Sequence, residues 1–461
     1  MRTKFRLNRE MIAAILALAW PTMLEQLMQT AVQYVDTAMV GSLGTQATAA
    51  VGATSTVSWL VGSSVSALGV GFLSFIARAC GAGDREAASR ASAQALLIVL
   101  AAGTLFTALT LSLSGVIPVW MRADESIRET ASRYFFLLYL PMLPRTASII
   151  FGTVLRAAGD TKSPMKIGVL VNLVNVVLNF LLIHPSRTLT VFGLSFPMWG
   201  AGLGVTGAAA ASATAFTVGG VLITVILWHH PLVSPKGRRL TPDRDILAPC
   251  LKVALPNMLQ RFGTSFGYVA FASMINSLGD ISTAAHTIAN TVESAFYIPG
   301  YGMQTAAATL AGNAYGARDR QRMRDLASMM IPIEIGLMIL SGGLLFVLAR
   351  PFMGIFSSSA EVIALGTTVL CMVALSEPFY GFSIIMEGMI LGVGNTKLPF
   401  AYNIIGMWGV RIVGTFIFTQ ILSFGLVAAW GCMIAHNLLI FVLYLRCHLR
   451  RSWNPLEAVR N

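Results

Sequence analysis

The sequence carries little charge for its length. Asp, Glu, Lys and Arg make up 11% of the 461 residues, 55% are hydrophobic, and the mean hydropathy is +0.71. A soluble globule of this size needs much more polar surface, and no amphipathic helices with charged faces separate the apolar runs. The low charge excludes a soluble protein and places the chain in a lipid bilayer.

Several chemical motifs are also missing. The five cysteines are widely spaced and form no CxxC or Cys/His set, so we expect buried thiols rather than a metal or redox site. No GxxxxGKS or GxxxxGKT phosphate loop occurs, so uphill work would draw on an ion gradient and not on ATP. No Ser/His or His/Asp set lies within one apolar segment, which argues against a membrane-embedded enzyme. We therefore expect no enzymatic activity and no cofactor other than a coupling ion.

Long apolar runs recur along the whole chain. Each is long enough to cross a hydrocarbon core of roughly 30 Å as an α-helix. They predict an all-α polytopic membrane protein of twelve transmembrane helices. The expected spans cover residues 12–39, 47–77, 91–117, 129–155, 164–184, 201–228, 247–275, 282–312, 327–348, 361–392, 399–421 and 427–447.

The net charge of +12 comes from basic residues that are distributed unevenly among the loops. Of the 32 Lys and Arg residues, 24 fall in loops that the expected spans place on one side, and five on the other. Loops rich in Lys and Arg stay in the cytoplasm. The bias predicts a multi-pass protein of the inner membrane with both termini in the cytoplasm, and it argues against a nucleic-acid partner. The basic start of the chain has no secretory cleavage site, so we expect it to be retained.

The chain contains an internal repeat at a constant offset of 235 residues. Pro21 aligns with Pro256, and residues 159–162 (GDTK) align with residues 394–397 (GNTK). Six helices per half preserve orientation, so we expect parallel repeats about an axis along the membrane normal, with a central cavity between them. The predicted division is a six-helix lobe at 1–228, a basic cytoplasmic linker at 229–246 and a second six-helix lobe at 247–461.

The first span carries a row of polar side chains on one helix face. The row consists of Glu25, Gln29, Gln33 and Asp36. An ionisable group at membrane depth is costly unless it faces a cavity or a partner, so this face is expected to look into the protein. We expect Asp36 to bind the coupling ion, a proton or sodium. A structural aspartate bonded to a neighbouring helix is the alternative.

Three asparagines lie on one face of the fifth span, at positions 172, 175 and 179. Amides also serve as packing contacts between membrane helices, but the repeat favours a functional role. At the offset of 235, the second half has Phe271, Val410 and Gly414 in place of Asp36, Asn175 and Asn179. Because the three polar groups are absent together, we expect them to form one cation site. Their oxygens suit a proton or a hard cation such as sodium, and we expect no other metal.

Polar residues within the second half are further candidates. Glu293, Glu377 and Glu387 lie in or at the ends of spans, and Arg411 is expected as an ion-pair partner of one of them. For each of these residues, structural pairing is the alternative to a coupling role. The residues expected to line a substrate cavity are Glu25, Gln29, Gln33, Asn172, Glu293, Gln304, Glu377 and Arg411.

Several segments resemble the multidrug and toxic compound extrusion (MATE) family over nearly the whole chain. They are WPTMLEQLMQTAVQYVDTAMVGSLG (20–44), LRAAGDTKSPM (155–165), PGYGMQTAAATLAGNAYGA (299–317) and LGVGNTKLP (391–399). The resemblance implies a V-shaped pair of six-helix bundles, a monomer, and export of cationic or amphiphilic drugs by alternating access, in exchange for protons or sodium.

The same resemblance assigns roles to individual residues. Asp36, Asn175 and Asn179 match the family's cation-site positions in the first lobe, and Ser212 falls near a hydroxyl ligand position. NorM-type members carry acidic residues in the seventh and tenth helices, where this chain has Thr264 and Phe379. The chain is therefore more similar to DinF-type members.

Two other transporter classes are alternatives to this family. The major facilitator superfamily also has six plus six spans, but residues 81–85 match its loop motif only in part. A lipid or lipid-linked oligosaccharide flippase of the related superfamily is the stronger alternative. Its cavity would carry several cations for pyrophosphate, whereas only Arg145, Arg261 and Arg411 fall inside the expected spans here.

Overall fold

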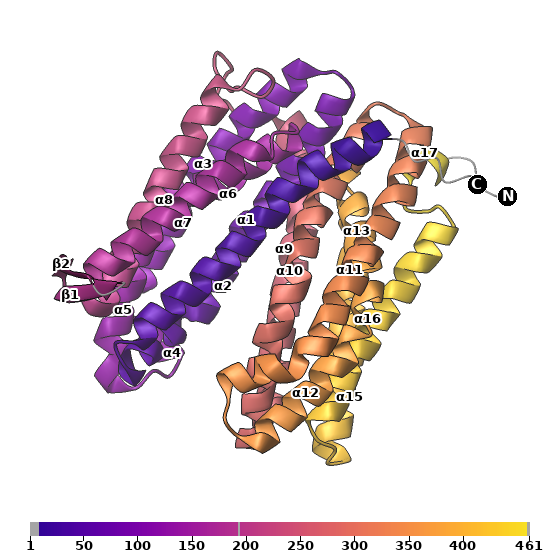
Figure 1. Ribbon diagram of the computed structural model, residues 1–461. Helices are drawn as coiled ribbons and strands as arrows, with labels where there is room; N and C mark the ends of the chain where they lie inside the picture. Colours follow the sequence, from indigo (N-terminus) through magenta and orange to yellow (C-terminus); the bar gives the residue numbers. More distant parts are fainter. Residues whose placement is uncertain (1–8, 192–193, 459–461) are drawn as a thin grey trace. The chain divides into compact units, whose positions relative to one another are not determined.

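The computed structural model describes residues 9–191 and 194–458. It consists almost entirely of helices, with one small hairpin (Figure 1). The first half contains α1 (Arg9–Gly41), α2 (Thr45–Gly81), α3 (Arg85–Leu113), α4 (Ile117–Trp120), α5 (Glu125–Tyr139), α6 (Met142–Ala157), α7 (Lys162–Leu182), β1 (Pro185–Val191), β2 (Leu194–Ala201) and α8 (Gly204–His229). The second half contains α9 (Arg244–Asn276), α10 (Asp280–Gly316), α11 (Arg320–Phe356), α12 (Ala360–Ala374), α13 (Glu377–Gly392), α14 (Lys397–Ile404), α15 (Val413–Thr415), α16 (Leu426–Leu449), α17 (Pro455–Ala458) and the π-helical segments η1 (Ile405–Ile412) and η2 (Phe416–Ile421).

The helices account for each of the predicted spans. Among the described residues, eight helices are long and apolar enough to cross a membrane, and two bent pairs, α5–α6 and α12–α13, raise the number to ten. The other two spans correspond to α9 and α10, helices of 33 and 37 residues. They are less apolar, since α9 carries Lys252 and Arg261 and α10 carries Glu293. The prediction of an all-α polytopic protein is confirmed.

Proline explains both bent pairs. Each pair bends by 52° at its break. Pro141 immediately precedes α6, and Pro378 lies in the first turn of α13. Because proline has no N–H to donate, it interrupts the helical hydrogen bonds and is tolerated best at a helix start. Pro21, Pro256 and Pro299, in contrast, remain inside continuous helices.

The chain folds into two compact units. One comprises Leu27–Phe72 and Arg85–Ala248, and the other comprises Met1–Gln26, Leu73–Asp84 and Pro249–Asn461. The second unit includes the start of α1 because Thr22 Oγ donates to the Gly302 carbonyl at 2.9 Å. The predicted lobes at 1–228 and 247–461 follow the sequence repeat, whereas the compact units divide α1, α2 and α9 between them.

The repeat also appears in how the helices pack. In the first half, Gly69 of α2 faces Thr153 of α6, and a Cβ at Gly69 would lie 3.1 Å from the Thr153 hydroxyl. In the second half, the equivalent positions are Gln304 of α10 and Gly388 of α13, where a Cβ at Gly388 would lie 2.5 Å from the Gln304 carbonyl. Each half therefore has one glycine at this crossing, on opposite helices, which lets two helices approach closely.

A hairpin interrupts the helices before α8. β1 and β2 pair antiparallel, with Arg187 opposite Met198 and an irregularity after Pro185. The sequence reading expected only a long loop in this region. The segment PSRTLTV contains three β-branched residues and no long apolar run, and such residues favour extended backbone.

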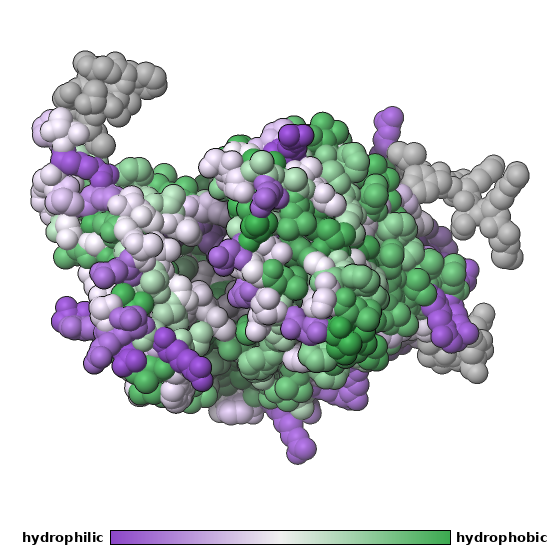
Figure 2. All heavy atoms as spheres, turned by 90° about the horizontal axis from the view of Figure 1, so that it is seen from below, coloured by the Kyte–Doolittle hydropathy of each residue, from purple (hydrophilic) through white to green (hydrophobic). Residues whose placement is uncertain are grey.

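The outer surface is apolar, as a membrane-embedded protein requires. Figure 2 shows broad hydrophobic areas with hydrophilic side chains in separate groups. On α11, Leu340, Leu344 and Val347 follow one face of the helix, and Val347 is 73% exposed. Within the second compact unit, a buried core joins α10, α11 and α13 around residues such as Met330 and Met386. Apolar side chains therefore cover the outside as well as fill the core.

The linker between the repeats is held against α3. The Arg90 guanidinium forms an ion pair with Asp243, and the Asp243 backbone N–H donates to the Gln94 side-chain oxygen at 3.0 Å. The ion pair and the hydrogen bond from Arg90 hold the pKa of the Asp243 carboxyl below its usual range. Because the pKa of Asp243 is lower in the folded protein, its ion pair with Arg90 stabilises the fold fully above the ordinary aspartate pKa. This stabilisation is lost as the pH falls through the pKa of the folded state.

The ion pair predicts how the linker responds to protease. Asp243→Asn keeps the side-chain oxygen that caps the Asp245 N–H but removes the charge, so trypsin at pH 8 should cut the linker a few times faster than in the native protein. Asp245→Asn, which lies outside the ion pair, is the control. Equal cleavage of all three proteins would show that the pair does not hold the linker. Between pH 8 and pH 6 the native protection should stay constant.

Candidate functional site

Asp36 lies near the end of α1 and meets two side chains of α7. Asn175 Nδ2 donates to both carboxylate oxygens, at 3.0 and 2.9 Å, and Asn179 Nδ2 donates to Oδ1 at 2.5 Å. Asn175 and Asn179 are four residues apart, so they lie one above the other on the same face of α7 and reach one carboxylate. Both asparagines are buried, and Asp36 is half-buried. The structure thus joins the three residues that the repeat singled out.

Ser212 of α8 completes a chain of polar contacts. Its hydroxyl donates to Asn175 Oδ1 at 3.2 Å, while Asn175 Nδ2 faces Asp36. Both ends of the Asn175 amide are therefore used, and the serine fixes which end points at the carboxylate. Ser212 contacts Asn175 and not Asp36, so it positions an amide rather than touching the carboxylate itself. All four residues lie within one compact unit.

The cluster contains an acceptor oxygen without a partner. Asn179 Oδ1 is buried and receives no hydrogen bond from the described residues. Buried polar atoms are rarely left unpaired, so this oxygen, next to a carboxylate, fits a cation or a protonated group. Asp36 is also the cluster's only carboxylate. No three His, Cys, Asp or Glu side chains come together as a metal site anywhere in residues 9–191 or 194–458.

If the cluster is the cation site expected from the sequence, Ser212→Ala should weaken ion binding only modestly. The change removes one neutral hydrogen bond, which contributes about 0.5–1.5 kcal/mol, so ion affinity should fall by roughly tenfold or less. The measurement is the ion concentration that gives half-maximal transport in vesicles. Thr214→Ala, on the same helix, removes a hydroxyl that bonds only to its own helix at the Ala210 carbonyl and should leave the affinity unchanged. Complete loss of transport in Ser212→Ala would make the serine a direct ligand.

The other polar residues of α1 and α7 lie outside this cluster. Gln29 and Gln33 are exposed, and neither contributes a side-chain hydrogen bond to Asp36. Glu25 is half-buried and belongs to the other compact unit. Asn172 is half-buried, and its Nδ2 has no partner among the described residues. The four polar residues of α1 lie on one continuous helix. That their shared face looks into the protein, and that these residues and Asn172 line a substrate cavity, stay predictions.

The second half buries three glutamates on neighbouring helices. Glu293 of α10 is 6% exposed and Glu377 of α13 is 2% exposed. Glu334 of α11, which the sequence reading passed over, is fully buried, and neither of its oxygens has a partner among the described residues. Glu334 and Glu377 lie where α11 and α13 pack, since Gly381 of α13 faces Glu334 and Gly342 of α11 faces Glu377. A single glutamate inside the apolar run MMIPIEIGLMIL was the signal that could have revealed Glu334.

Among the described residues, Arg411 does not form the expected ion pair with a glutamate. Its guanidinium lies 4.2 Å from the ring centre of Phe271 and 4.8 Å from that of Tyr268, and Nη2 contacts Met433 Sδ at 3.1 Å. No carboxylate of the described residues lies within ion-pair distance of it, although the charge of Glu293 acts on it electrostatically. Phe271 occupies the position equivalent to Asp36, so in the second half aromatic rings and an arginine replace the carboxylate and amides. The contacts of the Arg411 guanidinium with the rings of Phe271 and Tyr268 are cation–π contacts.

Gln304 contributes to helix packing. Its backbone carbonyl approaches Gly388 of α13, and the residue is half-buried. Nothing among the described residues brings its side chain to Glu293 or Glu377. A role in substrate binding therefore stays a prediction.

A family model described as MatE matches the chain twice, at residues 21–181 and 256–417. The two matches begin at Pro21 and Pro256, the pair that opens the sequence repeat, and together they cover more than half of the chain. The internal duplication read from the sequence is therefore confirmed by an independent comparison.

Relatives and solved structures cover nearly the full length. The chain is 27% identical to the "Probable multidrug resistance protein NorM" of Thermotoga maritima, over 95% of this chain and 92% of that protein. It is also 27% identical to the protein of the same name from Chromobacterium violaceum, over 88% and 87% of the two chains. The structure described as the outward-facing conformation of a multidrug resistance MATE family transporter of the MOP superfamily superposes with a TM-score of 0.86 at 25% identity, covering 95% of both chains.

Proposed function

Because this chain belongs to the MatE family of multi-pass membrane transporters, we propose that it exports organic cations and amphiphilic drugs in exchange for protons or sodium ions. The names of the relatives support drug export. The coupling ion would bind at Asp36, Asn175 and Asn179, with Ser212 positioning Asn175. We further propose an inner-membrane protein with cytoplasmic termini that acts as a monomer.

The main support for ion coupling is the environment of the Asp36 carboxylate. Asp36 is half-buried and is held by two amide donors, and the oxygen of one of these amides, Asn179 Oδ1, has no partner among the described residues. A carboxylate at membrane depth is costly to keep and marks ion or proton pathways in transporters. The second half of the repeat lacks the whole set, so a purely structural role would have to be needed in only one half.

A proton and a sodium ion would require different orientations of the Asn175 and Asn179 amides. The asparagines now present nitrogen to Asp36, whereas a sodium ion prefers oxygen ligands. Binding sodium would therefore require Asn175 to turn its oxygen inward and to give up its bond from Ser212. A proton needs only one carboxylate oxygen to become free. Either ion would neutralise Asp36 and weaken the contacts between α1 and α7, which links ion occupancy to the arrangement of these helices.

The DinF-type subclass and the flippase alternative differ in how well they are supported. The relatives named above are called NorM, so similarity to DinF-type members is a proposal that rests on Thr264 and Phe379 at the NorM acidic positions. A lipid or oligosaccharide flippase has no comparable support, and we do not propose it.

The function is tested with purified protein in sealed vesicles. Efflux of ethidium is followed while a proton gradient or a sodium gradient is imposed separately. Transport driven by one ion alone would establish exchange and identify that ion. Transport that ignores both gradients would contradict ion coupling, and the absence of ethidium transport alongside movement of a labelled lipid would favour the flippase.

A further inference from the structure

The linker builds a pocket against the first turns of α3. Its backbone is fixed by side chains of that helix: Gln94 Nε2 donates to the Thr241 carbonyl at 2.9 Å, and Ser89 Oγ donates to the Ser234 carbonyl at 2.6 Å. Arg238 Nε in turn donates to Ser89 Oγ at 3.0 Å. The walls of the pocket are therefore ordered by the protein itself.

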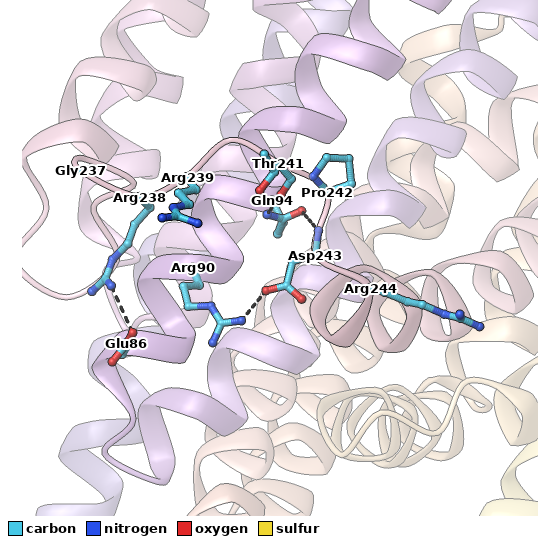
Figure 3. A pocket seen from close by; sticks show the side chains of 10 residues that line it. All are labelled: Glu86, Arg90, Gln94, Gly237, Arg238, Arg239, Thr241, Pro242, Asp243 and Arg244. Carbon is cyan, nitrogen blue, oxygen red and sulfur yellow. Dashed lines mark hydrogen bonds and ion pairs between the residues drawn. The ribbon is translucent and has the colours of Figure 1, made fainter.

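The cavity measures about 460 Å³. Figure 3 shows Arg238 and Arg90 each facing a carboxylate, with Arg239 on the same side and Arg244 extending away from them. The residues that line it are Glu86, Arg90, Gln94, Gly237, Arg238, Arg239, Thr241, Pro242, Asp243 and Arg244. All belong to one compact unit.

The pocket carries more positive than negative charge. Four arginines line it against two carboxylates, which leaves an excess of two positive charges. The carboxylates are engaged by Arg90 and Arg238. Arg239 and Arg244 have no ion-pair partner among the described residues, and both are exposed. Just outside the lining, Lys236 and Asp245 cancel each other. The Arg239 guanidinium is thus free to receive an anion in the pocket, while Arg244 extends away and adds positive charge at its edge.

The pocket lies where the membrane surface is expected. The helix α3, which contains an apolar membrane span, begins at Arg85, directly beside the lining residue Glu86. Two large apolar side chains stand out nearby: Trp228 at the end of α8 is 39% exposed, and Leu240, next to Arg239, is 47% exposed. Tryptophan is typical of the boundary between lipid and water. Phosphate groups of lipids lie at this level, and basic pockets beside spans bind anionic head groups.

We propose that this pocket binds the phosphate group of an anionic lipid head group, with Arg239 as its main contact and Arg244 adding positive charge at its edge. The planar guanidinium group offers paired N–H donors that match phosphate oxygens. A lipid held there fastens the linker and the start of α3 to the membrane surface. The inference concerns the linker and does not depend on which compound or ion the protein transports.

Native mass spectrometry of the full-length protein tests the site. The protein, in a neutral detergent, is titrated with phosphatidylglycerol, with phosphatidylcholine and with inorganic phosphate. We expect phosphatidylglycerol to bind at least about fivefold more tightly than phosphatidylcholine. Combining Arg239→Gln with Arg244→Gln should reduce this preference about tenfold or abolish it, whereas Lys236→Gln, which removes a neighbouring charge outside the lining, should leave it intact.

The results distinguish a lipid head group from a soluble phosphate compound as the ligand. An unchanged preference in the double variant would overturn the proposal. Equal binding of both lipids, together with arginine-dependent binding of inorganic phosphate, would keep a phosphate site but assign it to a soluble compound. Charge-retaining lysine substitutions at the same two positions should preserve part of the preference, which distinguishes loss of the site from misfolding.

Discussion

Replacing Asp36 with asparagine is expected to abolish ion-driven drug efflux, with a fall of at least about 100-fold in the gradient-dependent rate. Asparagine keeps the shape of the side chain but can neither take up a proton nor attract a sodium ion. Hydrogen bonds to a charged group contribute about 1.5–3 kcal/mol each, and Asp36 accepts such bonds from Asn175 and Asn179. The proposed exchange site therefore depends on this one charge. The measurement is ethidium efflux from vesicles under each imposed gradient.

A matched control is the next residue on the same helix. Thr37 is exposed, and its hydroxyl donates to the Gln33 carbonyl of α1, so Thr37→Ala should retain ion-driven efflux. Asn175→Ala should lower the rate strongly but leave the carboxylate able to exchange protons. Full activity in Asp36→Asn, with the protein folded, would contradict the assignment of the coupling site to the first half.

The second large effect concerns stability. Gly392→Ala places a Cβ 2.1 Å from the carbonyl oxygen of Ala308 in α10. The contact is with backbone, so no side-chain rotation relieves it, and α10 and α13 must separate. Overpacking of this kind costs about 3 kcal/mol. We expect a clear fall in the melting temperature, followed by tryptophan fluorescence in detergent.

The control for this prediction is another helical glycine. Gly336 on α11 has no atom within 4 Å of the position that a Cβ would occupy. Gly336→Ala should therefore leave the stability unchanged or raise it by less than about 1 kcal/mol, because alanine favours the helix. If the two variants melted at the same temperature, close packing between α10 and α13 would not determine the stability of this unit.

Gly388 and Gly392 form a small-residue pair on one face of α13, spaced by four residues. The spacing alone is typical of close helix contacts in membranes, but it does not name the partner. The structure identifies α10 as the partner, through the carbonyls of Gln304 and Ala308. The glycine pair could therefore be predicted as a contact surface from sequence, whereas its partner could not.

The sequence by itself determined the membrane class, the duplication and the identity of the cation-site candidates. The length of the apolar runs indicates burial in lipid, and the offset of 235 residues indicates two equivalent halves. A lone carboxylate in an apolar helix indicates a functional role. These signals are local or periodic, so they can be read without coordinates. Asp36, Asn175 and Asn179 were found in this way.

Only the tertiary structure decided which polar groups meet. Ser212 contacts Asn175 and not Asp36, Arg411 lies over aromatic rings and forms no ion pair with a glutamate, and Glu334 joins a buried group of glutamates. Side-chain partners on different helices depend on the rotation and approach of those helices, which spacing within one helix does not specify. The arginine pocket of the linker has the same origin, because the fold of a loop against α3 brings its charges together.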